Sequence, residues 1–104
     1  MTFRLPQNLS TQLNYERGES VLNYEIMAEK AASLGRAGKI IETALAKLQQ
    51  FSGPPAERLA LVHSAADAVH AFLIQRELCG MMSHDDAIAH YQVPREVIAK
   101  LGAK

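Results

Sequence analysis

Residues 24–48 read YEIMAEKAASLGRAGKIIETALAKL, and this stretch decides the fold. Within it, apolar or small residues recur at alternating steps of three and four, which is the spacing of one face of an α-helix. A single helix cannot shield such a face from water, so we expect the rest of the chain, or a second copy, to cover this seam. The seam consists of Tyr24, Met27, Ala31, Leu34, Gly38, Ile41, Leu45 and Leu48.

The seam lies on the first helix of an expected antiparallel hairpin. That helix is predicted over about residues 19–51, and the following SGPP at 52–55 supplies a stop and a new start. A second helix is predicted over about residues 55–79, because two adjoining apolar rows run along it and Gly80 follows its end.

Two short helices are predicted after the hairpin. Ser83 with Asp86 resembles a capping box and would open a helix that ends at about Tyr91. Pro94 would open the last helix, which stops at Gly102. No run of alternating apolar residues indicates a strand. The predicted fold is therefore all-α: a long antiparallel helical hairpin plus two short C-terminal helices. The hairpins of two chains are expected to complete a four-helix bundle as a dimer.

The chain is expected to form one domain preceded by an arm. Residues 1–18 mix isolated apolar residues with Pro6, Gly18 and several Asn, Ser and Thr, a pattern too broken for a regular element. We therefore predict an N-terminal arm at 1–18 and a single helical domain at 19–104. The arm could lie across a groove or remain unattached.

Composition limits the function classes. The 104 residues carry 11 basic and 11 acidic side chains, so no overall charge attracts nucleic acid or anionic lipid. The single cysteine, Cys79, cannot form an internal disulfide, and the N-terminus lacks the pattern of a secretory signal. No stretch approaches the roughly 20 apolar residues of a membrane span. We expect a cytoplasmic protein.

A homodimer is the expected assembly. Small residues occupy the positions beside the seam where a two-stranded coiled coil usually carries charge, so the apolar face is too wide for one neighbour. Two hairpins from separate chains would bury it, although an unidentified protein partner could also do so. Two glycines of the first helix either permit close approach of a neighbour or mark a kink: Gly35 and Gly38.

A metal-binding helical bundle is the first alternative. His63, Asp67 and His70 follow one another at steps of four and three, which places them on one face of the second helix. Metal ions bind imidazole and carboxylate groups at such spacings. The first helix has no histidine, so only a symmetric dimer could complete the site, and a solvated polar stripe is the other interpretation. No cofactor is expected.

A degenerate helix-turn-helix regulator is the second alternative. Residues 85–101 roughly follow the apolar skeleton of that motif, with residues 94–101 as the reading helix. The motif often has glycine in its turn, where this chain has Gln92, and the charges of residues 83–104 are balanced. Since DNA binding normally needs a basic face, the sequence argues against nucleic acid.

Short strings in three parts of the chain resemble a known family. They are NYEIMAEKA at 23–31 with LGRAG at 34–38, QRELCG at 75–80, and YQVPREV at 91–97. Together they resemble a bacterial family of small helical proteins of unknown function, over about residues 19–102. The resemblance implies a compact helical protein and transfers no catalytic residue. We therefore predict a non-catalytic, homo-oligomeric protein-interaction module and no enzyme.

Overall fold

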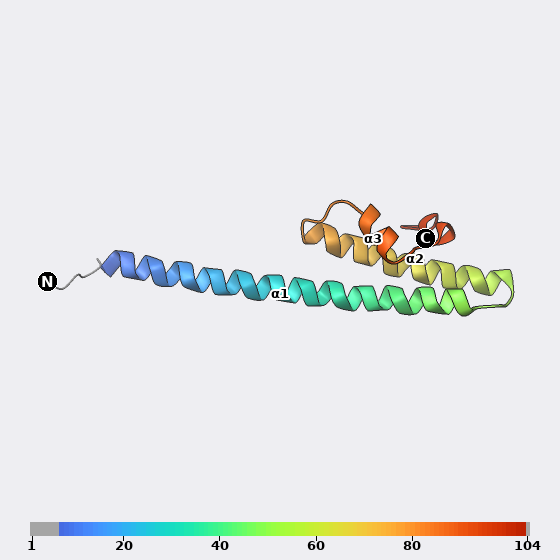
Figure 1. Ribbon diagram of the computed structural model, residues 1–104, viewed down its shortest axis with the longest axis horizontal. Helices are drawn as coiled ribbons and strands as arrows, with labels where there is room; N and C mark the ends of the chain where they lie inside the picture. Colours follow the sequence, from blue (N-terminus) through green and yellow to red (C-terminus); the bar gives the residue numbers. More distant parts are fainter. Residues whose placement is uncertain (1–6, 104) are drawn as a thin grey trace. The chain divides into compact units, whose positions relative to one another are not determined.

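The computed structural model describes the backbone of residues 7–103 and the side chains of residues 16–103. It contains four helices in the order α1 (Gln7–Gln50), α2 (Pro55–Leu78), α3 (Asp85–His90) and α4 (Arg95–Ile98) (Figure 1). No described residue belongs to a strand. The predicted all-α class, with a helical hairpin and two short C-terminal helices, is confirmed. The chain divides into two compact units, residues 1–31 and residues 32–104.

Helix α1 begins earlier than the sequence predicts. It starts at Gln7, so residues 7–18 of the predicted arm are helical, whereas residues 1–6 lie outside the described part of the chain. Pro6 directly precedes the helix, where a proline does no harm. The polar residues that suggested an arm lower helix propensity by only a few tenths of a kcal/mol each, and Gly18 by about 1 kcal/mol, so they do not prevent a helix.

The ends of α2 follow the sequence signals. Pro54 has the extended backbone of an N-cap, and Pro55 occupies the first helical position, where its missing N–H costs nothing. At the other end Gly80 has φ +85°. The Gly80 N–H donates to the Glu77 carbonyl at 2.9 Å and the Met81 N–H to the Arg76 carbonyl at 2.8 Å, which together form a Schellman motif.

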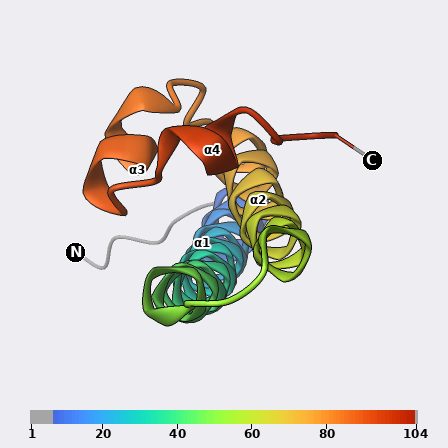
Figure 2. The ribbon, with the colours of Figure 1, turned by 90° about the vertical axis from the view of Figure 1, so that its right-hand side faces the viewer.

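The second unit, residues 32–104, holds the hydrophobic core. Its part of α1 and α2 form the hairpin, and α3 and α4 lie on one side of that pair (Figure 2). Ile41 and Leu48 of the seam are 1% and 2% exposed, and Val97 of α4 is completely buried. All four helices therefore contribute to one core. Its other members are Val62, Ala65, Ala66, Val69, Phe72, Leu73, Ala87 and Val93.

Gly38 is a point of close approach, but to the side chain of Tyr91 and not to the backbone of another helix, which was the expected neighbour. A Cβ built at this position would lie 2.3 Å from the Tyr91 hydroxyl oxygen, so only glycine leaves room for this side chain. The Tyr91 ring also meets Phe72 edge to face, with centroids 5.4 Å apart. Helix α1 continues through both glycines, and a Cβ at Gly35 would meet nothing within 4 Å.

The predicted capping box of α3 does not form. The N-cap is His84 and not Ser83, and no side chain caps the helix. Two side chains of α2 hold this connection instead. An Arg76 guanidinium nitrogen donates to the Ser83 carbonyl at 3.0 Å, and His84 Nε2 lies 2.8 Å from Glu77 Oε1. These two contacts with α2 hold residues 83 and 84 in place. Helix α3 therefore begins after His84, and Ser83 does not act as its cap.

Helix α3 ends in a second Schellman motif, but without glycine. The Val93 N–H donates to the Ile88 carbonyl at 3.1 Å and the Gln92 N–H to the Ala89 carbonyl at 3.2 Å. Gln92 has φ +52°, whereas Gly80 takes up the corresponding position after α2. A side chain in this left-handed region costs roughly 1–2 kcal/mol.

We expect Gln92→Gly to raise the free energy of unfolding by about 0.5–1 kcal/mol, because relief of this cost exceeds the extra entropy of an unfolded glycine. Gly80→Ala, the matched change in the other motif, should lower it by about 1 kcal/mol. Urea denaturation followed by circular dichroism measures both. An unchanged or lower stability of Gln92→Gly would contradict the expectation.

Candidate functional site

The structure divides the eight residues of the predicted interface into two groups. Gly38, Ile41 and Leu48 are buried within the second unit, and Leu34 and Leu45 are partly buried there. Tyr24 and Met27, in contrast, are 75% and 69% exposed, and Ala31 is exposed. The C-terminal part of the seam is therefore core of the protein's own chain, and the N-terminal part is exposed.

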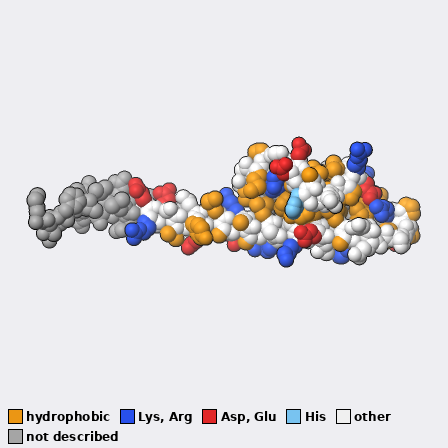
Figure 3. Space-filling model, viewed as in Figure 1, with side chains coloured by type: hydrophobic (Ala, Val, Ile, Leu, Met, Phe, Trp, Pro, Cys, Tyr) orange, Lys and Arg blue, Asp and Glu red, His pale blue; other side chains and the backbone are white. Residues whose placement is uncertain are grey.

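The first unit carries apolar side chains on several sides of α1. Five large ones are between 44% and 75% exposed, and together we name them the N-terminal apolar surface: Val21, Leu22, Tyr24, Ile26 and Met27. Figure 3 shows hydrophobic side chains at the surface of α1, among and beyond the charged side chains that border the grey residues. These side chains alternate with polar ones such as Asn23 and Glu25, so the segment combines a polar composition with several large exposed apolar side chains.

The second unit has an open groove along its hairpin. Two adjoining hollows of about 460 and 300 Å³ share Ile40, and every residue that lines them belongs to α1 or α2. Ile40 and Ile74 are 60% and 43% exposed in it. Three cationic side chains, Arg36, Lys39 and Lys47, also line the two hollows. We name this feature the α1–α2 groove and refer to six of its residues below: Ser33, Ala37, Ile40, Ala44, Ala71 and Ile74.

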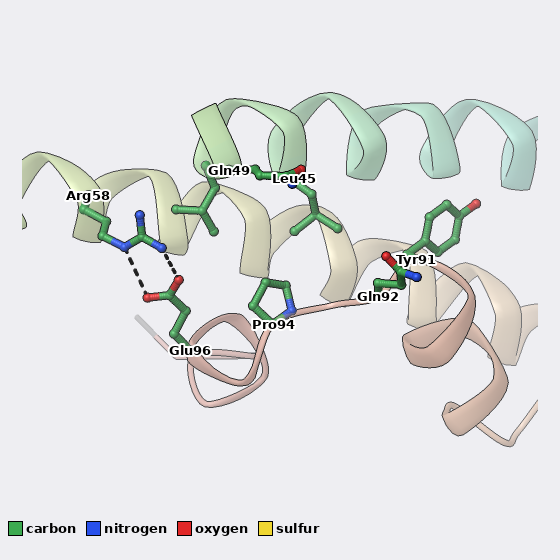
Figure 4. Close-up of a pocket in the computed structure, with 8 residues that line it drawn as sticks. Leu45, Gln49, Arg58, Tyr91, Gln92, Pro94 and Glu96 are labelled. Carbon is green, nitrogen blue, oxygen red and sulfur yellow. Dashed lines mark hydrogen bonds and ion pairs between the residues drawn. The ribbon is translucent and has the colours of Figure 1, made fainter. Parts of the chain in front are cut away.

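A different cavity of about 460 Å³ lies where the connection between α3 and α4 meets α1 and α2 (Figure 4). Arg58 of α2 and Glu96 of α4, which both line this cavity, form a bidentate ion pair. In it, Arg58 Nε lies 3.4 Å from Glu96 Oε2. The rest of its lining includes Leu45, Tyr91 and Gln92. Because Glu96 neutralises the single cation of the lining, the ion pair connects α4 to α2 and leaves no charged group for a ligand.

The predicted metal ligands lie along α2 without converging. His63 is partly buried, whereas Asp67 and His70 are exposed. A Cβ at Gly102 would lie 3.8 Å from His70 Nε2, which places this ring beside the C-terminal turn. Among the residues whose side chains are described, no group of three or more His, Cys, Asp or Glu is arranged to hold a metal ion. Residues in line on one helix need ligands from a second element, and α1 offers none here.

The segment predicted as a helix-turn-helix consists of two very short helices. α3 has six residues and α4 has four. Gln92 occupies the turn between them with the left-handed backbone that a glycine would favour. In α4, however, Val97 is buried in the core and Glu96 pairs with Arg58, so these two residues serve packing.

Sequence reasoning missed Leu22, Ile26, Ile40 and Ile74 as surface residues of interest. The seam was the stronger periodic signal, so the interface was assigned to its residues and not to these four. A second series along α1, at steps of seven, contains Ile26 and Ile40 and could have identified them.

Neither a curated protein nor a solved structure matches this chain. One family model matches all of it, residues 1–104, with the description "Family of unknown function (DUF6665)". The match extends beyond residues 19–102, over which the resemblance was expected, and it confirms a family without an assigned function. Within residues 7–103, no helix has both the length and the apolar character needed to cross a membrane.

Proposed function

Since the chain belongs to this family of unknown function, its own surfaces must indicate its role, and we propose that it is a non-catalytic protein-interaction module that forms a homodimer through the N-terminal apolar surface. The exposure of Tyr24 and Met27 carries the proposal. Both belong to the seam whose members Ile41 and Leu48 build the core of the second unit. The same repeat therefore changes from core to surface along α1.

The physical cost of this surface supports an interaction role. Most helical stability in proteins comes from packing of an apolar face and not from helix propensity. Exposed apolar side chains that are concentrated in one segment therefore mark a contact site. The five side chains of the N-terminal apolar surface fall within seven consecutive residues, 21–27, which concentrates the exposed apolar area.

We expect the tag-free protein to have the mass of a dimer in size-exclusion chromatography with light scattering, over a wide range of concentrations. Met27→Glu should raise the dissociation constant of the dimer at least about tenfold, because it places a charge in an apolar contact. Met82→Glu is the matched control, since Met82 is the same residue type and similarly exposed, at 71%, but lies after the end of α2.

A monomer at every concentration would contradict the dimer. A dimer that Met27→Glu and Met82→Glu weaken equally would show that the N-terminal apolar surface is not the contact. Circular dichroism of both variants establishes that the second unit remains folded.

A further inference from the structure

We infer that the N-terminal apolar surface of one copy binds in the α1–α2 groove of a second copy, with the two α1 helices antiparallel and a two-fold axis near Ser33. This inference rests on the proposed homodimer and names its binding mode. It commits to a second copy of this chain as the occupant of the groove. In this arrangement each α1 has its own α2 beside its C-terminal half and the α1 of the other copy along its length.

A heptad series along α1 sets the register. Its members occur every seven residues and share one heptad position: Glu19, Ile26, Ser33, Ile40 and Lys47. All except the partly buried Ser33 are exposed. The series is symmetric about Ser33: an isoleucine lies seven residues away on each side. Fourteen residues away, an acidic side chain lies on one side and a basic one on the other.

An antiparallel pair centred on Ser33 matches every member of this series. Ile26 of each copy lies opposite Ile40 of the other, and Glu19 opposite Lys47. Both isoleucines are exposed in the chain by itself, at 44% and 60%. Such a contact is isologous, because the same patch of both copies forms it.

The overall charge of α1 favours the same direction. From residue 16 to 29 the helix has four acidic side chains and one basic, and from 30 to 47 it has four basic and one acidic. Antiparallel helices place each acidic segment along a basic one, whereas parallel helices in register place like charges together. Compensation of the helix dipole does not explain this division, because that effect is confined to the terminal turns and the first turn of α1 contains no acid.

The groove has room for the side chains that this register brings to it. Small residues, Ala37, Ala44 and Ala71, border the exposed Ile40 and Ile74. Leu22 and Ile26 of the second copy would enter between them, as knobs enter holes between two helices. Leu22 and Ile26 lie about 40° apart around α1, whereas Tyr24 lies about 160° from Ile26 and therefore outside this contact.

Cross-linking tests the register. In a Cys79→Ser background, Ser33→Cys alone should give a covalent dimer with a short bismaleimide, because the two copies of this residue meet at the axis. Ile26→Cys and Ile40→Cys should each fail alone and react when the two single variants are mixed. Cross-linking of Tyr24→Cys or Met27→Cys alone, with no reaction at Ser33→Cys, would overturn the antiparallel register.

Charge reversal tests the direction independently. Glu19→Lys and Lys47→Glu should each raise the dissociation constant of the dimer about three- to tenfold, and the double variant should return within about twofold of the unchanged protein. In a parallel pair the double variant would gain nothing over the single ones, which would overturn the proposal. A dimer with this second pattern leaves the homodimer standing, whereas a monomer in light scattering refutes both.

Discussion

Ile41→Ala will lower the free energy of unfolding by about 3–5 kcal/mol, because it leaves a cavity at one of the best-packed positions of the protein. Ile41 is 1% exposed and lies in the core with side chains of α2 and with residues of the C-terminal helices. A domain of this size has roughly 5–15 kcal/mol of stability in total, so the variant should be close to unfolding at 37 °C. Urea denaturation at a fixed protein concentration measures the loss.

The neighbouring Ile40 provides a control with the same chemistry. Ile40 is 60% exposed, so Ile40→Ala removes the same atoms with a loss of less than about 1 kcal/mol from the second unit. If the groove binds a second copy, Ile40→Ala should instead weaken the dimer in light scattering. Equal destabilisation by the two variants would mean that the burial described for Ile41 does not distinguish it from its neighbour.

Gly38→Ala will lower the free energy of unfolding by about 1–3 kcal/mol, although alanine is the better helix former by up to about 1 kcal/mol. The new Cβ would lie 2.3 Å from the Tyr91 hydroxyl oxygen, and contact with Phe72 restricts the Tyr91 ring. Thermal unfolding followed by circular dichroism gives the shift of the transition. A rise of the transition temperature would show that Tyr91 moves aside at little cost.

Two further variants separate the clash from helix propensity. Gly35→Ala, three residues earlier in α1, meets nothing within 4 Å and should raise stability by up to about 1 kcal/mol. Tyr91→Phe removes the clashing oxygen and leaves the ring carbon Cζ, 3.3 Å from the new Cβ, as the nearest atom. In this background Gly38→Ala should cost less than in the unchanged protein, which a double-mutant cycle measures.

The hairpin could be predicted from sequence because its signals are local. The SGPP turn and Gly80 act through backbone conformations that neighbouring residues determine, and α2 accordingly begins at Pro55 and ends at Leu78. The start of α1 at Gln7 could not be predicted in this way, because Asn, Ser and Thr lower helix propensity without preventing a helix. The capping box predicted at Ser83 and Asp86 failed for a different reason: here a local signal was present but did not decide the structure. Contacts of Arg76 and Glu77 with residues 83 and 84, which no local pattern announces, fix that loop.

The candidate surfaces were only partly accessible to sequence reasoning. The seam identified the residues that need covering, but its period could not say that α2 and the C-terminal helices cover Ile41 and Leu48 and leave Tyr24 and Met27 exposed. Which seam residues are covered depends on the length of α2, and the period of the seam in α1 contains no information about that length. The role of Gly38 likewise depends on Tyr91, a residue more than fifty positions away.

The lack of a core around residues 21–27 has a consequence for how the amount of protein affects its state. The folded form of that segment gains stability by mass action when it associates, whereas the second unit has its own core and gains little. In the proposed dimer, residues 21–27 would resist proteolysis at high protein concentration, and at low concentration they would be cleaved before the second unit.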